Sequence, residues 1–156
     1  MNSPYILKSI NIKALPETKD IHRFNSKAIR HTKSLGDIVG LTTVGIHLVR
    51  VEPGDETTQH HNHELSDEFI YILSGTAKIN IGDESHQVSH GDFVGFPMKG
   101  LAHSMVNTGA TDLVYLMGGG RPEIDICNYP HIKKRMYIIN DEREYVETDY
   151  LHKAGK

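Results

Sequence analysis

The stretch QHHNHELSDEFIYILSG, residues 59–75, combines metal-binding residue types with the alternation of a β-strand. Three histidines occupy four positions, acidic residues follow them, and a glycine ends the segment. Side chains two residues apart in a strand share a face, so His61 and His63 should point the same way, together with Gln59. His60 should point the other way. We therefore expect two imidazoles to converge on one point.

Short runs of strand-like sequence continue along the chain from Gly40 to Gly120. Many of them are rich in Val, Ile, Tyr, Phe or Thr, and Gly, Pro, Asn or Asp residues separate most of them. Such regular spacing is typical of antiparallel sandwiches and barrels rather than of alternating β and α units. We therefore predict an all-β fold, in which GTAKINIGDESHQV, residues 75–88, forms a hairpin around its GDES turn.

The two ends of the chain are patterned less clearly. Residues 1–34 lack a clean period, and we interpret them as an arm packed on the barrel, in which a short helix near 21–29 is an option. The barrel itself is expected over residues 35–120. Residues 121–156 should add one strand, RMYIIN at 135–140, and a polar tail. A length of 156 residues suits one domain.

Composition limits the partners of this chain. Its net charge is −3 and its Lys and Arg residues form no basic stripe, so we expect no nucleic-acid partner. No window approaches the ~18 apolar residues that cross a bilayer, and the first residues lack the apolar run of a signal peptide, so we expect no membrane partner. The single cysteine, Cys127, cannot form an intrachain disulfide, which favours a reducing, cytoplasmic location.

Glu68 and His103 are the residues best placed to join His61 and His63 as metal ligands. Divalent transition metals bind imidazole nitrogen and carboxylate oxygen, usually with ligands from more than one element. Glu68 begins the next strand, and His103, in GLAHSMVN at residues 100–107, lies near the start of a later strand that could pair beside the first. Taken alone, the clustered histidines could instead be a polar edge or an adventitious metal-binding surface.

Two ordered motifs resemble those of the cupin superfamily. The first contains, in order, Gly54, His61, Asn62, His63, Glu68 and Gly75. The second, GDFVGFPMKGLAHSMVN at residues 91–107, contains Gly91, Pro97, Gly100, His103 and Asn107. The resemblance extends from about Leu35 to Gly119. One extra residue follows Gly54 and another follows Pro97, both at expected loops or strand starts, where a bulge or a longer turn absorbs them.

The resemblance implies a jelly-roll barrel, the double-stranded β-helix of cupins, with six to eight strands and one metal ion in its mouth. It implies four metal ligands, namely His61, His63, Glu68 and His103. It also implies turn glycines at Gly75, Gly91 and Gly100. We interpret Asn107 as a structural residue that bonds backbone at a strand end. The segment after Gly119 is similar to small bacterial single-domain cupins that are often named sugar-phosphate isomerases.

Four protein ligands would leave one or two positions on an ion that prefers five or six. A small molecule with adjacent oxygens, such as a sugar or a keto or hydroxy acid, could chelate an Fe, Mn, Ni or Zn ion there. Three classes stay open: a metal-dependent isomerase, an Fe(II) dioxygenase, and a non-catalytic sensor or storage cupin. We expect substrate contacts from Gln59, Ile70 and Met105, with Gln59 as an orienting hydrogen-bond partner.

Neither a general base nor a phosphate site can be read from the sequence. Tyr71 and Tyr115 lie in the sheet region, where packing is the expected role of an aromatic ring. The chain has no Gly-rich phosphate loop, and Arg50, Lys99 and Arg121 follow no readable pattern.

A homodimer is the oligomer that we expect. A small jelly roll exposes edge strands, and the arm and the tail are long enough to lie across a second copy. Small cupins are commonly dimers, so the resemblance implies the same state.

Overall fold

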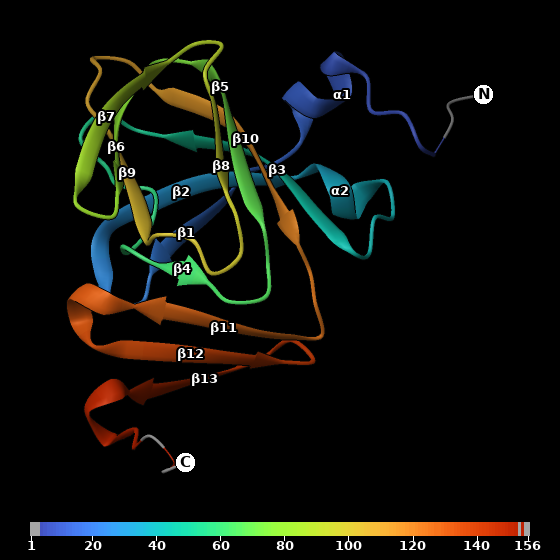
Figure 1. The fold of residues 1–156 in the computed structure, drawn as a ribbon. Coiled ribbons are helices and arrows are strands. Elements are labelled where there is room, and N and C mark those ends of the chain that lie inside the picture. The colour runs from blue at the N-terminus through green and yellow to red at the C-terminus, as the bar shows by residue number, and fades with distance from the viewer. Residues whose placement is uncertain (1–3, 153, 155–156) are drawn as a thin grey trace.

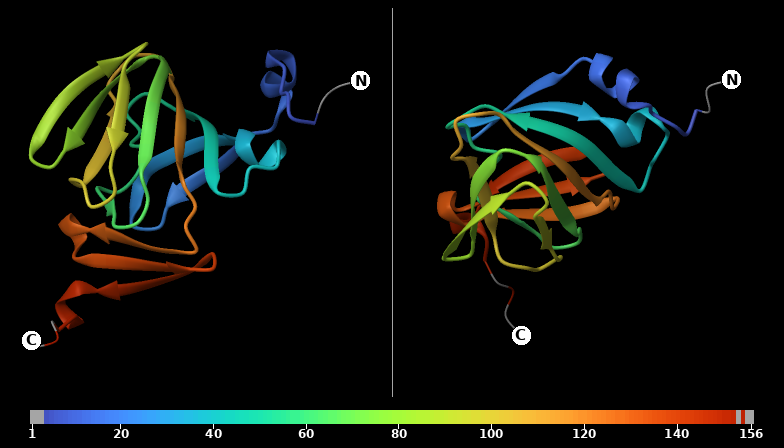
Figure 2. Two further views of the ribbon diagram at one scale, coloured as in Figure 1. Left: turned by 45° about the vertical axis from the view of Figure 1, so that its right-hand side comes forward. Right: turned by 90° about the horizontal axis from the view of Figure 1, so that it is seen from above.

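The computed structural model describes residues 4–152 and residue 154, and nearly all of its regular structure is antiparallel β-sheet. Two sheets form a barrel, and a third sheet lies beside its lower end (Figure 1). The N-terminal segment runs across one side of the barrel, and the C-terminal strands lie beneath it, as the turned views also show (Figure 2). The predicted all-β jelly-roll class is confirmed.

Two of the sheets make up the barrel. The six-stranded sheet has the order β1 (Thr18–His22), β2 (Asn25–Ser34), β3 (Val44–Val51), β10 (Leu113–Gly120), β5 (Glu68–Ser74) and β8 (Phe93–Phe96). The three-stranded sheet has the order β7 (Glu84–Ser89), β6 (Thr76–Ile81) and β9 (His103–Asn107). From β5 to β10 the chain passes back and forth between the two sheets, which is the connectivity of a jelly roll.

The third sheet joins the end of the chain to the segment that contains His61 and His63. Its order is β13 (Glu142–Glu147), β12 (Lys134–Ile139), β11 (Ile124–Tyr129) and β4 (Asn62–His63). Two short 3-10 turns follow β11 and β13, η1 (Pro130–Ile132) and η2 (Thr148–Tyr150). The strand predicted at 135–140 exists as β12. Two further strands, β11 and β13, pair on either side of β12, and β11 and β12 bury a small core of Cys127, Tyr129 and Met136.

Strand alternation places the main core inside the barrel. On β5, Ile70 and Ile72 are buried while Tyr71 between them is exposed. The other strands contribute in the same way, and the core also contains Val49, Val51, Ala77, Ile79, Val88, Phe96, Met105, Leu113 and Tyr115. Burial of this apolar surface is the main force that closes the barrel.

Turns and one buried amide set the strand connections. The predicted hairpin is present, with Ile81 paired to Glu84 across its turn. Gly75 has a φ of +85°, and a Cβ there would lie 2.7 Å from the Asp112 carbonyl oxygen, so only glycine fits. Asn107 is 1% exposed and donates hydrogen bonds to the carbonyl oxygens of Val51 and Thr111, both at 2.9 Å. This confirms its predicted structural role.

The N-terminal segment differs from the prediction. Residues 21–29 are not helical, because they form parts of the β1–β2 hairpin, and β2 pairs along β3. The helix lies earlier, as α1 (Ser9–Ala14), and a second short helix, α2 (Leu35–Ile38), connects β2 to β3. The unpaired backbone groups of β3 offer a ladder of hydrogen bonds to residues 31–34, and this tertiary pairing overrides a weak local preference.

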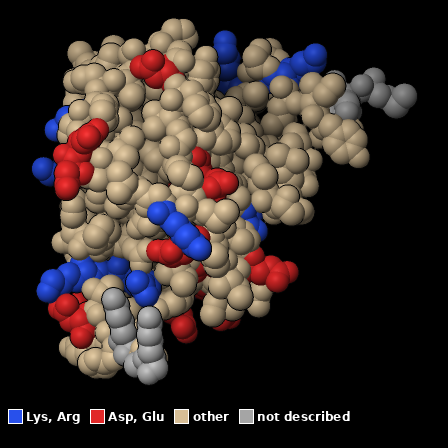
Figure 3. Space-filling model, in the orientation of Figure 1, with Lys and Arg blue, Asp and Glu red and all other residues tan. Residues whose placement is uncertain are grey.

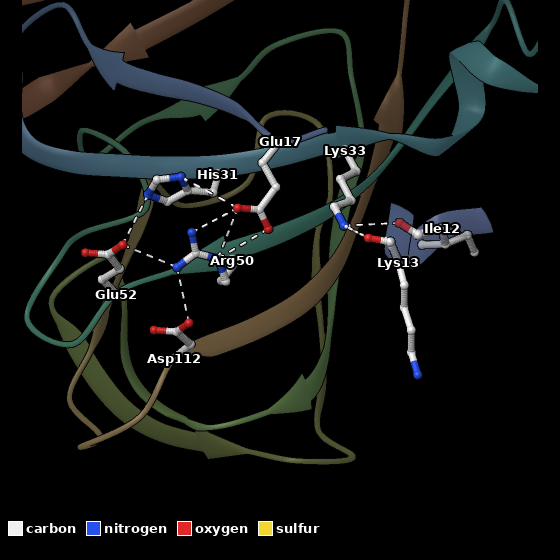
Figure 4. Close-up of polar contacts among 8 residues, drawn as sticks. All are labelled: Ile12, Lys13, Glu17, His31, Lys33, Arg50, Glu52 and Asp112. Carbon is white, nitrogen blue, oxygen red and sulfur yellow. Dashed lines mark hydrogen bonds and ion pairs between the residues drawn. The ribbon is translucent and has the colours of Figure 1, made fainter. Parts of the chain in front are cut away.

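A polar cluster fastens this segment to the barrel (Figure 4). Arg50 of β3 donates to Glu17 at 2.9 Å, to Asp112 at 3.1 Å and to Glu52 at 3.3 Å. His31 lies 3.8 Å from Glu17 and 3.6 Å from Glu52. We call these five residues the Arg50 cluster. Its hydrogen bonds join the segment before β1 to the end of β3 and the start of β10.

Charged side chains are mixed in sign on the face drawn in Figure 3, without a continuous basic patch there. Within residues 4–152 and 154, no helix is long and apolar enough to cross a membrane.

Candidate metal centre

Backbone pairing brings the four predicted ligands together. His61 and His103 exchange two backbone hydrogen bonds, of 3.0 Å from the His61 N–H and 2.7 Å from the His103 N–H. His63 lies on β4, Glu68 is the first residue of β5, and His103 is the first residue of β9. We call these four residues the histidine cluster.

One carboxylate oxygen is the centre of this cluster. Glu68 Oε2 lies 3.4 Å from His103 Nε2, 3.6 Å from His61 Nε2 and 3.7 Å from His63 Nε2. All four residues are buried or half-buried. Three imidazole nitrogens therefore surround one oxygen, as the spacing of the two motifs led us to expect.

The outer nitrogens of two rings fix how these rings are protonated. His61 Nδ1 donates to the Gln59 carbonyl oxygen at 2.9 Å, and His63 Nδ1 donates to Asp125 Oδ2 at 2.5 Å. A neutral imidazole that donates from Nδ1 has a lone pair on Nε2. Both lone pairs are therefore directed to the side of Glu68, which is itself an acceptor.

Asp125 of β11 is the outer partner that holds His63 in place. It is 3% exposed, and its other oxygen accepts hydrogen bonds from the backbone N–H groups of Leu65 at 3.0 Å and Ile126 at 2.8 Å. These bonds fix the carboxylate rigidly. Metal-binding histidines commonly have such a carboxylate behind them, because it fixes the ring and makes the free nitrogen a better ligand.

His103 is held by packing instead. The Phe96 ring stacks on it with centroids 3.6 Å apart and an interplanar angle of 7°. Its Nδ1 is the one buried side-chain nitrogen or oxygen without a hydrogen-bond partner among the described residues. Burial lowers the pKa of His103, although the neighbouring Glu68 acts in the opposite direction. The ring is therefore neutral at pH 7, as a metal ligand must be.

The carboxylate of Glu68 is ionised in the same range. Burial alone would raise its pKa, but the imidazoles of His103 and His61 beside it outweigh burial and hold the pKa well below its usual value. The cluster thus places one ionised carboxylate oxygen among three imidazole nitrogens.

These residues fit a divalent transition metal. Two ligands at about 2.1 Å from one ion, at angles near 90° to 110°, are themselves about 3.0 to 3.4 Å apart. The Nε2 atoms lie 3.4 to 3.7 Å from Glu68 Oε2, slightly beyond that range, and His61, Glu68 and His103 form one close group of possible ligand atoms. A cation would also stabilise a set of acceptor atoms that converge on one point. Cys127, on β11 opposite His63, lies in a second close group with His61 and His63, but burial raises its pKa to about 12, so its thiol stays protonated at pH 7.

A cavity of about 550 Å³ opens beside the cluster. Ile70 and Met105, which we predicted as substrate contacts, form part of its wall together with Tyr115. The N-terminal hairpin and the C-terminal sheet complete the wall, so segments that we interpreted as an arm and a tail take part in the site.

Gln59 and His60 line a different hollow, of about 290 Å³. The expectation that the Gln59 side chain shares the metal-facing side is wrong in position, because only its backbone carbonyl reaches His61. His60 faces away from the cluster, as predicted, and stacks on His131 with centroids 4.3 Å apart. Burial, followed by the neighbouring His131, lowers the pKa of His60 to about 4.

Asp125 and Cys127 are the residues near the cluster that sequence reasoning missed. Their signal was a polar residue within the apolar alternation IDICNY, residues 124–129, which indicates a strand with a buried polar side. No rule of spacing connects that strand to His63, because the pairing of β4 with β11 joins residues far apart in the chain.

Comparisons with known proteins agree with this architecture. Residues 47–119 match the family model of the cupin domain. A candidate sugar phosphate isomerase of Acidithiobacillus ferrooxidans is 37% identical, covers 98% of both chains and has a TM-score of 0.95. A sugar phosphate isomerase from a cupin superfamily, of Silicibacter pomeroyi, is 25% identical over 86% of this chain and 87% of that chain, with a TM-score of 0.78.

A curated relative is more distant. The protein SchB of Streptomyces halstedii is 29% identical over 89 residues, which is 56% of this chain. The chain spans only 63% of the length of SchB. Since the Acidithiobacillus structure shares fold and sequence over nearly the whole chain, and both motifs fall within the matched cupin domain, the protein belongs to the cupin superfamily.

Proposed function

We propose that this protein holds one divalent transition metal in the histidine cluster and binds a small molecule whose adjacent oxygens chelate that metal. The observation that carries the proposal is the convergence of three Nε2 atoms on Glu68 Oε2, at 3.4 to 3.7 Å. Fe, Mn, Ni and Zn all accept this set of nitrogen and oxygen ligands. A bound ion would supply Lewis-acid chemistry, in which it polarises an oxygen of the ligand.

The chain supplies the remaining parts of the site. Ile70, Phe96 and Met105 are buried apolar residues of the cavity wall, and such residues limit water around a bound ligand. Asp125 and the Gln59 carbonyl hold the rings of His63 and His61 in the orientation that leaves Nε2 free. These contacts fix the geometry before a ligand arrives.

His22 is the residue of the cavity wall best suited to act on a ligand oxygen. Its Nδ1 accepts a hydrogen bond from the Phe24 N–H at 3.2 Å, so a neutral ring holds its proton on Nε2. Burial, followed by the charges of His61 and Arg30, lowers its pKa and keeps the ring neutral. A neutral Nε2–H can donate to a carbonyl oxygen of the ligand and polarise it.

Isomerisation of a sugar is the activity that we favour. Its support is the naming of two similar structures, 37% and 25% identical, as sugar phosphate isomerases, together with a cavity large enough for such a molecule. Loss of one sugar isomer and appearance of another, followed by NMR with the metal-loaded protein, tests it. Consumption of O₂ in place of isomerisation would contradict the isomerase proposal and favour a dioxygenase.

Elemental analysis of two histidine variants tests the metal site. We expect one metal per chain in the unmodified protein and in His60→Ala, because His60 faces the other hollow. His103→Ala should lose most of the metal while the barrel stays folded. Unchanged occupancy in His103→Ala would remove this residue from the site, and loss of metal from His60→Ala would mean that the strand register differs.

We also propose a homodimer. Among the described residues, β1 is an edge strand of the largest sheet, and its Ile21 is 57% exposed. Sedimentation at micromolar concentration should give twice the chain mass, and a mass of one chain would contradict the proposal.

A further inference from the structure

The cavity beside the histidine cluster has an excess of positive charge, although the whole chain has a net charge of −3. Three arginines line it, Arg23, Arg30 and Arg143, against two carboxylates, Asp20 and Glu68. A metal ion in the cluster would add to this excess. The interior of the site is thus electropositive in an acidic protein, which is the charge pattern that attracts an anion.

Of the three arginines that line the cavity, Arg30 is half-buried, whereas Arg23 and Arg143 are exposed. Arg30 lies on β2 and is the strand partner of Asp20 on β1. Its positive charge acts to lower the pKa values of His22, His47 and Tyr115, although burial raises that of Tyr115 overall, so its guanidinium lies near three residues of the cavity wall. Yet its side chain forms no hydrogen bond or ion pair with any residue of the described part of the chain.

Three other arginines of this protein are hydrogen-bonded or ion-paired. Arg50 donates to Glu17 at 2.9 Å, Arg121 lies 2.6 Å from Asp37, and Arg135 donates to Asn128 at 2.8 Å. None of these three lines the cavity. A guanidinium that is half-buried and unpaired is unfavourable unless something else accepts its hydrogen bonds. Arg30 therefore has the properties of a binding residue rather than of a structural one.

We propose that the part of the cavity lined by Arg30 binds an oxyanion, phosphate or carboxylate, at the end of the ligand remote from the metal. The planar fork of a guanidinium matches the paired oxygens of both groups. His22 Nε2–H is a further donor on the same wall, and Arg143 adds positive charge from the C-terminal sheet. That this anion belongs to the metal-chelating ligand rests on the proposed function, whereas the anion site itself does not.

Titration with simple anions tests the site. Inorganic phosphate and malonate are added at constant ionic strength to the protein as purified and after treatment with chelator, and binding is followed by calorimetry and by the melting temperature. We expect saturable binding with and without metal. Arg30→Gln should weaken it at least about tenfold, whereas Arg135→Gln, a half-buried arginine outside the cavity, should bind as the unmodified protein does. The stronger of the two anions identifies the head group.

The outcomes separate this inference from the metal-based function. Equal binding by Arg30→Gln and the unmodified protein, or no saturable binding of either anion, overturns the anion site. Metal content is measured on the same samples. If the protein holds no metal but binds phosphate in an Arg30-dependent way, the proposed function fails and the anion site stands. If metal is bound and Arg30→Gln has no effect, the reverse holds.

Discussion

The histidine cluster and the Arg50 cluster each bring acidic and basic side chains together. Only in the Arg50 cluster do these side chains form hydrogen bonds of normal length with one another. In the Arg50 cluster, the guanidinium reaches Glu17 at 2.9 Å, a normal hydrogen-bond length. In the histidine cluster, the shortest separation from Glu68 Oε2 is 3.4 Å, and the lone pairs of two rings face it. The first cluster is complete in itself, whereas the second converges on a point between its members.

Burial sharpens the contrast. The side chain of Arg50 is 27% exposed and that of Glu52 is 55% exposed, so water screens their charges. The His103 side chain is 7% exposed and that of Glu68 is 21% exposed, where converging acceptors are costly. The comparison teaches that a binding site differs from a structural ion-pair network in the spacing and direction of its hydrogen-bond acceptors. The number of charged groups does not distinguish the two.

Removal of the charge at the centre of the histidine cluster should have the largest effect. We expect Glu68→Gln to lower metal affinity by more than the roughly 10- to 100-fold that loss of an outer partner causes, because Oε2 is the atom common to all three rings. Glu64→Gln is the matched control, since Glu64 accepts from Asn128 instead. Metal affinity is measured by competition with a chelator. Equal affinity in the two variants would contradict the role of Glu68 as a metal ligand, which is what distinguishes the histidine cluster from the Arg50 cluster.

Asp125→Asn should have the next largest effect. An amide can direct its NH₂ group to His63 Nδ1, which would then become an acceptor and move the ring proton to Nε2, the nitrogen that is needed for the metal. We expect metal affinity to fall by about 10- to 100-fold while the fold is retained. Asp149→Asn, on the exposed end of the chain, provides the control. Unchanged metal affinity would show that Asp125 packs beside His63 without affecting metal binding.

A decrease in pH should separate the two clusters. Metal affinity should fall between roughly pH 7 and pH 5, with more than one proton taken up per ion released, because protons compete for imidazoles that titrate near ~6.5 when free. Burial lowers the pKa of His103, so this ring resists protonation to a lower pH than a free imidazole does. Isothermal titration across this range gives the slope, and a shallow slope without loss of thermal stability on metal removal would contradict a four-ligand site.

The ion pair between Arg50 and Glu17 should be insensitive over that range. Hydrogen bonding to Arg50 lowers the pKa of Glu17 below its unfolded value. The stability that this shift contributes is therefore present above the usual pKa of a glutamate, about 4.3, and is lost only as the pH falls through the lower folded value.

Arg50→Gln should have the smallest of these effects. It leaves Glu17, Glu52 and Asp112 without their common partner, and we expect a loss of about 1 to 2 kcal/mol, or about 2 to 8 °C in melting temperature, because the cluster is partly exposed. Arg121→Gln, which breaks one exposed ion pair, should cost less. Metal content should not change in either variant. A loss of metal from Arg50→Gln would mean that the two clusters are coupled.

Spacing within strands predicted that His61 and His63 share a side, and the resemblance to the two cupin motifs implied Glu68 and His103 as their neighbours. His61 and His63 share a side because residues two apart do so, and the glycines and Asn107 of the two motifs indicated the barrel that brings His103 beside them. The same rule failed for Gln59 because residues 57–60 form bends rather than a strand, so side chains do not alternate there.

Long-range pairing explains what the sequence could not predict. The helix expected at 21–29 is a hairpin because β3 offers it an edge, and this puts Arg30 on the cavity wall. Asp125 reaches His63 because β11 pairs with β4. Strand periodicity predicts which residues share a face, but it does not predict which distant strand that face will meet.

The pairing of β4 with β11 also sets an order of events while the chain is synthesised. All four proposed ligands precede residue 104, and the barrel strands are complete at Gly120. His63, however, gains its neighbouring strand and its carboxylate only after β11 has left the ribosome and docked. We therefore expect full-affinity metal capture only after β11 has docked, so that a tightly held ion reports that this strand is in place.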